Sequence, residues 1–522
     1  MTEDLALWLL AWRDPLELAI LAMACAALVL CVDDVFVDLC YWWFRMTGRL
    51  RGDHGLPSPE ELAKMAQKPL AVMVPAWQEA DVIHAMLSTN FRLIQYREAH
   101  YFVGVYENDP DTLAEVERAQ RLSSRIHAVI VPRQGPTSKA DCLNEIVGHA
   151  LGAERALGVT FAGFVMHDAE DLIHPMELRV FNAALDKYDF IQLPVFSFTR
   201  RFKEFVAGVY MDEFAENHGK DMQVRERLGG FVPCAGVSAC FSRQAIQKLA
   251  ELQDGEAFPT GSLTEDYEAA FRVRELGLHS AFIRYTAEYY MDTPRGGGGP
   301  KLVKEPMTVS TREHFPHEFR AAYRQRARWN LGIVLVGNEQ LGWTGTPGTR
   351  FFVARDRKGV IAIPAVMIGY ALFVLYVTLR IALHFGWSDG QVPPSSIMDT
   401  TAAWWLIGAS LVLALWRLGH RMYFTGTLYG WRHGLLAAPR MVVSNFVNFT
   451  AMARAIRLYV LNRVFGKPLT WDKTAHTYPD TLATQLPSLL AAGAASRLPQ
   501  SQDDAARAEL ERAMGRPPGS LR

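Results

Sequence analysis

Three long stretches of the chain contain no charged side chain. They cover residues 18–32, 360–379 and 400–416, and the first resumes after Asp33 and Asp34 as residues 35–37. A transmembrane α-helix needs about 20 mostly apolar residues, with about 17 as the lower limit. Each stretch therefore predicts a membrane span, with a buried core helix as the alternative. The first stretch follows the acidic start MTEDLALW and precedes no small-residue cleavage site, so it is predicted to be a retained span and not a secretory signal.

Clusters of basic residues predict the orientation of these spans. The clusters follow the first span, precede the second and follow the third, whereas residues 386–399 contain two Asp and no Lys or Arg. Segments rich in Lys and Arg stay in the cytosol. Residues 46–358 and the C-terminal region are therefore predicted to lie on the cytosolic side of a bacterial inner membrane. The clusters consist of Arg45, Arg49, Arg51, Arg350, Arg355, Arg357, Lys358, Arg417 and Arg421.

A different pattern follows the third span. Between residues 435 and 460, Arg440, Arg454 and Arg457 interrupt an apolar face, which is typical of a helix lying in the membrane interface. A fourth span is the alternative. The pattern as a whole predicts an N-terminal segment with the first span (1–45), a cytosolic domain (46–358), two spans (359–418), interfacial helices (419–483) and a largely disordered tail (484–522).

Within the cytosolic segment, residues 69–195 alternate short apolar runs with stretches of helical length. The apolar runs are PLAVMVPAW, YFVGVYEN, IHAVIVP, FAGFVMHD and DFIQLPV. Alternating strands and helices with near-continuously apolar strands predict an α/β fold with a parallel sheet covered on both faces. Such sheets bind ligands beyond the carboxyl ends of their strands.

Carboxylates and other polar residues close three of these predicted strands. Their repulsion is costly unless a cation or a donor-rich ligand offsets it, so a divalent metal that binds phosphate oxygens is expected there. The chain contains no GxxxxGKS motif, and no GxGxxG follows the first strand, which argues against a P-loop enzyme and a dinucleotide-dependent oxidoreductase. The polar residues are Gln78, Glu79, Glu107, Asn108, Asp109, Asp111, His167, Asp168, Glu170 and Asp171.

The composition of the chain argues against nucleic acid as a partner and for segments buried in lipid. The chain has 54 Lys and Arg against 55 Asp and Glu, a net charge of −1, so it lacks the basic surplus of a nucleic-acid-binding protein. Half of the residues (50%) are apolar and the mean hydropathy is +0.01, which predicts large polar regions joined to a few lipid-buried segments. The six cysteines form no CxxC pair, so neither a disulfide nor a zinc site is expected.

Five motifs occur in the order VPAWQE, SKADCLN, HDAED, TED and QRARW. In this order, and with spans on either side, they resemble the processive family 2 glycosyltransferases, which have a GT-A fold. The segments VPCAGVSACFSR, TEDYEAAFRVRELG, REHFP and WDKTAHTYP are more similar still to the phage-adsorption protein B group of inner-membrane glycosyltransferases. The resemblance covers about residues 30–480. It implies a GT-A (Rossmann-like) cytosolic domain joined to transmembrane and interfacial helices.

The resemblance implies a metal site at the fourth strand. Asp168 and Glu170 match the Asp-x-Asp that holds Mg²⁺ or Mn²⁺ against the donor diphosphate, with Glu as a departure in the second place. Asp171 could replace Glu170 as the second ligand, and His167 is expected to be part of the scaffold. The alternative is an acidic turn that caps a helix beginning near Pro175.

Asp266 matches the general base of the family, and Thr264 and Glu265 precede it. An inverting transfer needs a carboxylate that takes the proton of the acceptor hydroxyl. The alternative is a capping segment at the start of the helix YEAAFRVRELG. Both functions are compatible in one segment.

The remaining implied site residues concern the donor and the acceptor. Arg328 is expected to hold the pyrophosphate, while Trp329 would stack on the acceptor sugar with Gln325 beside it; an amphipathic surface helix is the alternative. Gly236, in the loop of residues 234–237, would lie beside the acceptor, unless that loop is a plain tight turn. The remaining donor-binding candidates, which ordinary strand-end turns could also explain, are Pro75, Ala76, Glu79, Asn108, Asp109, Lys139 and Asp141.

The implied function is a membrane-bound inverting transfer from a nucleotide sugar, UDP-linked in the resembling enzymes, that extends a β-linked polysaccharide. The alternatives are a single transfer to a lipid acceptor and a phage receptor or assembly protein with vestigial catalysis. The implied partners are the nucleotide sugar, the growing glycan, membrane lipid, an outer-membrane protein and a second copy of the chain, but no nucleic acid. No cyclic di-GMP-binding domain is recognised after WDKTAHTYP, and residues 296–299 are expected to form a mobile loop over the site.

Overall fold

The computed structural model describes residues 3–295, 298–386, 395–467 and residue 478 of the 522-residue chain. The predicted tail at residues 484–522 lies outside the described residues. Two compact units divide the chain: one holds residues 1–47, 199–224 and 316–469, and the other holds residues 48–198, 225–315 and 470–522. The predicted cytosolic segment 46–358 is thus shared between both units. We call them the helical unit and the sheet unit and describe each by itself.

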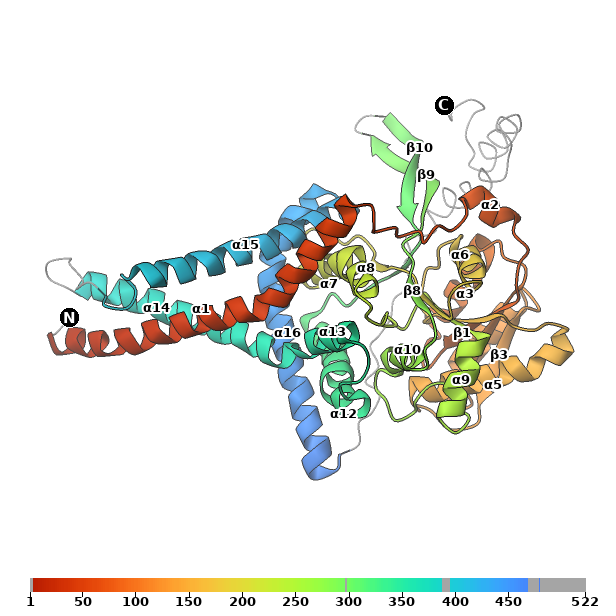
Figure 1. Ribbon diagram of the computed structural model, residues 1–522. Coiled ribbons are helices and arrows are strands. Elements are labelled where there is room, and N and C mark those ends of the chain that lie inside the picture. The colour runs from red at the N-terminus through yellow and green to blue at the C-terminus, as the bar shows by residue number, and fades with distance from the viewer. Residues whose placement is uncertain (1–2, 296–297, 387–394, 468–477, 479–522) are drawn as a thin grey trace. The chain divides into compact units, whose positions relative to one another are not determined.

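The sheet unit is built on a seven-stranded sheet with the order β3-β2-β1-β4-β7-β5-β8 (Figure 1). All paired strands are parallel except β7, which is antiparallel to both β4 and β5. The predicted α/β fold is therefore confirmed. The strands are β1 (Leu70–Pro75), β2 (Ala99–Tyr106), β3 (Ile126–Val131), β4 (Gly163–Met166), β5 (Phe190–Gln192), β7 (Ala239–Ser242) and β8 (Ser280–Phe282).

The register of the sheet explains why three polar strand ends meet. Leu70 of β1 pairs with both Ala99 of β2 and Gly163 of β4, so the carboxyl ends of these parallel strands lie at the same edge. All six residues of β1 are buried, as expected for a strand covered on both faces. The helices of the unit are α2 (Pro59–Lys64), α3 (Ile83–Leu93), α4 (Pro110–Gln120), α5 (Lys139–Leu157), α6 (Glu177–Ala184), α9 (Arg243–Leu252) and α10 (Glu265–Glu275).

Two small sheets complete this unit. Strand β11 (Thr311–Glu313) pairs in parallel with β6 (Val195–Ser197), and β9 (Thr286–Arg295) forms an antiparallel hairpin with β10 (Gly298–Thr308). The expectation of a mobile loop at residues 296–299 is corrected in part, because residues 298 and 299 belong to β10. Gly298 pairs with Arg295 across the hairpin, and the register is irregular between Gly298 and Lys301. Residues 296–297 lie outside the described residues.

The helical unit contains three helices that are long and apolar enough to cross a membrane: residues Leu10–Met46, Gly359–Phe385 and Thr401–Tyr429. They match the three predicted spans. Its other helices lie on residues 199–224 and 316–469, and α8 extends three residues past the first of these segments (Figure 1). The elements are α1 (Glu3–Met46), α7 (Phe205–Glu216), η1 (Asn217–Asp221), α8 (Met222–Arg227), α11 (Phe319–Trp329), η2 (Asn330–Val336), α12 (Gly337–Leu341), α13 (Pro347–Arg357), α14 (Gly359–Gly386), α15 (Thr401–Tyr429) and α16 (Trp431–Phe465).

Helix α16 runs across the long axes of α1, α14 and α15 in Figure 1. Its sequence contains five Arg and neither Asp nor Glu. It is not among the described helices that meet the length and hydropathy of a span, so the fourth-span alternative gains no support. An interfacial position for α16 stays a prediction. Its exposed large apolar residues are Trp431, Leu435, Val442, Phe446, Phe449, Ile456, Val460, Val464 and Phe465.

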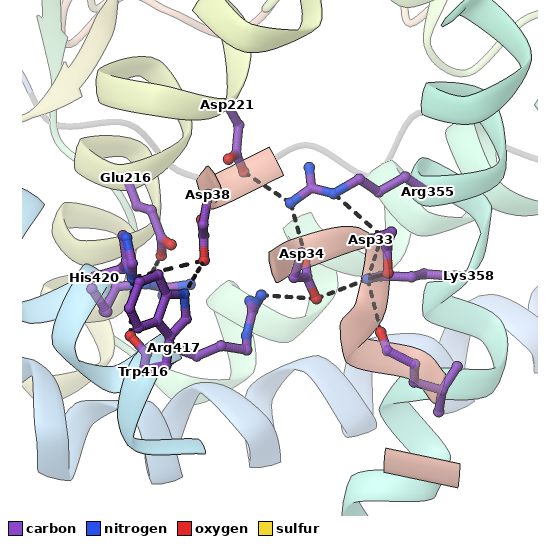
Figure 2. A network of polar contacts seen from close by, with 12 residues as sticks. Asp33, Asp34, Asp38, Glu216, Asp221, Arg355, Lys358, Trp416, Arg417 and His420 are labelled. Carbon is purple, nitrogen blue, oxygen red and sulfur yellow. Dashed lines mark hydrogen bonds and ion pairs between the residues drawn. The ribbon is translucent and has the colours of Figure 1, made fainter. Parts of the chain in front are cut away.

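Acidic residues of the first span meet basic residues from other helices of the same unit (Figure 2). Asp34 lies 2.8 Å from Arg355 of α13 and 2.8 Å from Arg417 of α15, and Lys358 lies 2.6 Å from Asp33. A charge in or beside a membrane segment is costly unless it is paired. In the sequence, these basic residues predicted only the orientation of the spans. The structure shows that they also pair with the acidic side chains of the first span.

Candidate active site

Lys139 brings together three of the residues that the sequence singled out. It is the first residue of α5, after the N-cap Ser138. Its Nζ lies 2.5 Å from Asp168 Oδ1 and donates to the Gly236 carbonyl oxygen at 3.3 Å. Burial alone would lower the pKa of Lys139, but the carboxylates of Asp168, Glu265 and Asp266 raise it above its ordinary value. The ammonium is therefore charged and sits among acids.

Asp266 lies directly against Gly236. Its Oδ1 accepts a hydrogen bond from the Tyr267 amide at 2.7 Å, and a Cβ added at Gly236 would fall 2.6 Å from its Oδ2. Gly236 has φ +80°, a conformation that a side chain disfavours. The structure thus places the predicted base beside the loop predicted to face the acceptor.

Thr264 and Glu265 begin the helix that carries Asp266. Thr264 is the N-cap residue of α10, yet its side chain makes no capping hydrogen bond within the described part of the chain. Glu265 is buried, and its charge acts on Lys139. The acidic first turn still favours the helix N-terminus electrostatically. Side-chain capping alone therefore does not account for this segment.

We expect Gly236→Ala to lower turnover at least tenfold, because the new methyl group would displace Asp266 Oδ2. A contact under 3 Å forces one of the two groups to move, and small misplacements at a reacting centre cost about 10²-fold. Gly229→Ala is the matched control, since Gly229 has φ +76° and open space around its Cβ position. Steady-state rates and thermal unfolding of both variants check this. Equal losses of rate in the two variants would refute the steric explanation.

The loop after β4 carries the three predicted metal ligands in different environments. The Asp168 side chain is 32% exposed, whereas Glu170 is buried and Asp171 is fully buried. Asp171 Oδ2 accepts a hydrogen bond from the Asp168 amide at 3.0 Å and contacts His167 Nδ1 at 2.8 Å. Asp171 therefore shapes the loop that presents Asp168. No group of three potential metal ligands occurs among the described residues.

Glu313 is a carboxylate near this loop that sequence reasoning did not select. Burial and the negative charges of Asp171, Glu170 and Asp168 raise its pKa well above the ordinary value, and Lys139 acts in the opposite direction. Strand β11, which ends at Glu313, is joined to this loop by a backbone bridge between Leu172 and Arg312, which are distant in sequence. The motif REHFP was the one available signal. Glu313 therefore shares the electrostatic environment of the three carboxylates in this loop.

The predicted donor residues at β1 and β2 hold two loops together. Asn108 exchanges hydrogen bonds with the backbone of Gly135 at 2.7 and 2.8 Å, and Asp109 Oδ2 accepts from the Gln78 amide at 2.5 Å. Pro75 closes β1, the Ala76 amide bonds the Gly104 carbonyl, and the Glu79 amide donates to the Thr112 hydroxyl. These contacts connect the loops at this edge of the sheet. A role of these residues in recognising the nucleotide base stays a prediction.

Asp141 differs from the other donor candidates. Arg133 forms an ion pair with it, with Nε at 3.1 Å from Oδ2. The same arginine contacts Glu145 one turn further along α5 at 2.9 Å. The Asp141 carboxylate is therefore already paired with Arg133 at the N-terminus of α5. A sugar nucleotide that binds Asp141 would have to share this carboxylate with Arg133.

Gln325, Arg328 and Trp329 lie on α11, as a helical reading of QRARW predicts. This helix belongs to the helical unit. Arg326 was not among the residues selected from the sequence. It is the buried arginine of the motif, and its Nη1 donates hydrogen bonds to Glu213 Oε2 at 2.6 Å and to Asn448 Oδ1 at 2.7 Å. The ring of Trp329 meets that of Tyr210 edge-on, with centroids 6.2 Å apart.

Comparison with known proteins assigns the family. A family model described as "Glycosyltransferase like family 2" matches residues 67–332, which is more than half of the chain. The chain belongs to glycosyltransferase family 2. The matched range includes every candidate site residue of the sheet unit, and it also includes QRARW.

Curated relatives support the narrower resemblance. "Bacteriophage adsorption protein B" of Escherichia coli K12 is 38% identical over 481 residues, which cover 90% of this chain. "Bacteriophage N4 adsorption protein B" of Escherichia coli O157:H7 matches to the same extent. The chain spans 64% of the length of these relatives. The predicted membership of a family 2 group with membrane helices and phage-adsorption relatives is confirmed.

Solved structures of similar proteins are more distant. The mannosyltransferase PcManGT from Pyrobaculum calidifontis, in complex with GDP-Man and Mn²⁺, is 16% identical with a TM-score of 0.46 and covers 81% of this chain and 99% of its own. S. aureus TarS 1–349 in complex with UDP is 11% identical with a TM-score of 0.30 and covers 79% of this chain and 97% of its own.

Proposed function

We propose that this family 2 glycosyltransferase transfers a sugar from a UDP-sugar, with inversion, to a growing β-linked polysaccharide at the cytosolic face of a bacterial inner membrane. The contact between Asp266 and Gly236, with Lys139 joining Gly236 to Asp168, is the observation that carries this proposal. It puts a candidate base and a candidate diphosphate site side by side on one rim of the sheet.

The proposed step follows from the roles of these residues. Asp266 takes the proton of the acceptor hydroxyl as its oxygen attacks the anomeric carbon. The new glycosidic bond forms while the bond between that carbon and the diphosphate breaks, and UDP leaves with the electron pair. Lys139 holds positive charge where the diphosphate gains negative charge, which stabilises the transition state.

Asp168 and Glu170 would hold Mg²⁺ or Mn²⁺ in this step. When bound, the ion offsets the charge of the diphosphate. Asp168 can serve this purpose because its side chain is partly exposed, while Asp171 is committed to the loop backbone. We therefore assign the second carboxylate position to Glu170 and not to Asp171.

Release of UDP tests the function. Membranes that contain the full chain should release UDP from at least one member of a UDP-sugar panel, in the presence of Mn²⁺ or Mg²⁺ and not after chelation. GDP-mannose serves as the control donor with another base. Folded protein that releases no UDP from any donor would refute the proposal.

The length of the product separates polymerisation from a single transfer to lipid. A ladder on a gel supports a processive enzyme, as the position of Gln325, Arg328 and Trp329 on one helix face favours. A single lipid-linked sugar would support the alternative. The adsorption role in the names of the relatives fits a surface product of this enzyme as well as a receptor, and a partner in the outer membrane would export such a product.

A further inference from the structure

A fully buried ion-pair network lies behind the rim of the sheet unit. Its centre is His167, the residue after β4, whose side chain has no exposed surface. His167 Nδ1 lies 2.8 Å from Asp171 Oδ2, and Nε2 lies 2.8 Å from Glu177 Oε1 on α6. All three side chains are 0% exposed. None of them reaches the surface where a sugar nucleotide would bind.

The Asp171 end of this network fixes the loop that presents Asp168. Asp171 Oδ2 accepts the Asp168 amide, and its backbone oxygen accepts from the buried Asn90 at 2.8 Å. Asn90 also accepts from the Ile173 amide at 2.9 Å. The backbone on both sides of Glu170 is thus tied to buried groups.

The Glu177 end contacts the Gly236 loop and β11. Glu177 Oε2 accepts from the Ser238 hydroxyl at 3.0 Å and from the Thr311 hydroxyl at 3.1 Å. Ser238 follows Gly236 by two residues, and Thr311 precedes Glu313 by two. One carboxylate therefore links α6, the Gly236 loop and β11.

The chemistry of the network indicates a purpose beyond packing. Both ring nitrogens of His167 face a carboxylate oxygen at 2.8 Å, so the imidazole joins Asp171 to Glu177 inside the unit. Two buried carboxylates around one imidazole are costly, and apolar residues of similar size often give equal or better stability. What such a group provides is fixed geometry, because an ion pair with two partners holds both at set distances.

We propose that His167 and Glu177 are positioning residues that hold the Asp168 loop and the Gly236 loop at a fixed separation. The inference rests on the proposed function, since it assigns the donor to the first loop and the acceptor to the second. His167 acts through Asp171 on the donor side, and Glu177 acts through Ser238 on the acceptor side. Residues that orient metal ligands in this way typically change metal affinity or activity about 10- to 100-fold when they are replaced.

Two variants separate the two ends. His167→Gln removes the imidazole that joins Asp171 to Glu177, so the dissociation constant of Mn²⁺ with UDP should rise about 10- to 100-fold. Ser238→Ala leaves both ion pairs in place and removes only the hydrogen bond between the Gly236 loop and Glu177, so it should lower kcat severalfold at unchanged Mn²⁺–UDP affinity. Electron paramagnetic resonance of Mn²⁺ with UDP and the purified full chain measures binding without turnover.

His174→Gln is the matched control in the same loop. Burial lowers the pKa of His174 to about 3, so this buried imidazole is neutral, and it accepts a hydrogen bond from the Met176 amide. The control should leave the affinity for Mn²⁺ with UDP unchanged. Wild-type affinity in folded His167→Gln, or wild-type kcat in Ser238→Ala, would overturn the proposal. If wild-type protein releases no UDP from any donor, the proposed function fails, while the binding measurement still tests the positioning role.

Discussion

Asp266→Asn is expected to lower turnover about 10²- to 10⁴-fold, the usual contribution of a general base, while UDP binding stays at the wild-type level. Asparagine has the same shape and can keep the contacts with Gly236 and with the Tyr267 amide. What it loses is the ability to take a proton from the acceptor hydroxyl. Steady-state kinetics and UDP binding by calorimetry, with full chain in detergent, measure the two effects separately.

Glu275→Gln is the matched control for this substitution. Glu275 is the last residue of α10, at the end of the helix opposite to Asp266, and it pairs with Arg272 at 2.7 Å. The same change from acid to amide should leave kcat unchanged there. Turnover that persists in Asp266→Asn would show that another group is the base and would remove the main argument for the proposed mechanism.

Lys220→Met is expected to destabilise the helical unit by about 3–5 kcal/mol, the usual cost of breaking a buried ion pair. Lys220 is 1% exposed in η1 and pairs with Asp38 of the first span, with Glu216 at 2.9 Å and with Asp221 at 3.4 Å. Burial alone would lower its pKa, but these carboxylates raise the pKa above the ordinary value. Methionine keeps the length of the side chain and leaves three acids without this cation. The thermal unfolding midpoint in detergent should fall by several degrees.

Lys203→Met provides the control, because Lys203 is an exposed lysine of the same unit. It should change the midpoint by less than a degree or two, since exposed substitutions away from special features cost little. Adding Asp38→Asn to Lys220→Met should cost less than the sum of the single changes, because the two residues share one contact. An additive pair, or a Lys220→Met protein as stable as wild type, would contradict the role of this cluster.

Strands β1 to β5 were predictable because their signals are local, whereas β7 and β8 lie outside residues 69–195, where the strands were predicted. Each buried strand is a near-continuous apolar run, and Ser138 and Lys139 mark the start of α5 as a capping residue and a first helical residue. Asp168 follows β4 and was selected by a strand-end argument. Lys139 and Asp266 lie in the first turns of α5 and α10, Gly236 precedes β7, and the family resemblance selected these three. Their contact within a few ångströms is the part that the structure adds.

The groups that the sequence did not reveal depend on contacts between distant segments. Glu313 and Thr311 reach the Asp168 loop and Glu177 only because β11 pairs with β6 and bridges Leu172. The acids of the first span were read as interruptions of an apolar run, since their basic partners on α13, at Lys358 and on α15 come more than three hundred residues later. No local pattern specifies such pairs.

The anomeric configuration of the transferred sugar tests the central claim most directly. A UDP-sugar with an α-linked donor should give a β-linked product, because Asp266 activates the acceptor for attack on the face opposite to the diphosphate. Proton NMR of the product of the full chain, with the donor identified by UDP release, reads the configuration from the anomeric coupling. A β product that is absent in Asp266→Asn is the predicted result. An α product would contradict the account, because retention leaves no role for Asp266 as the base of an inverting transfer.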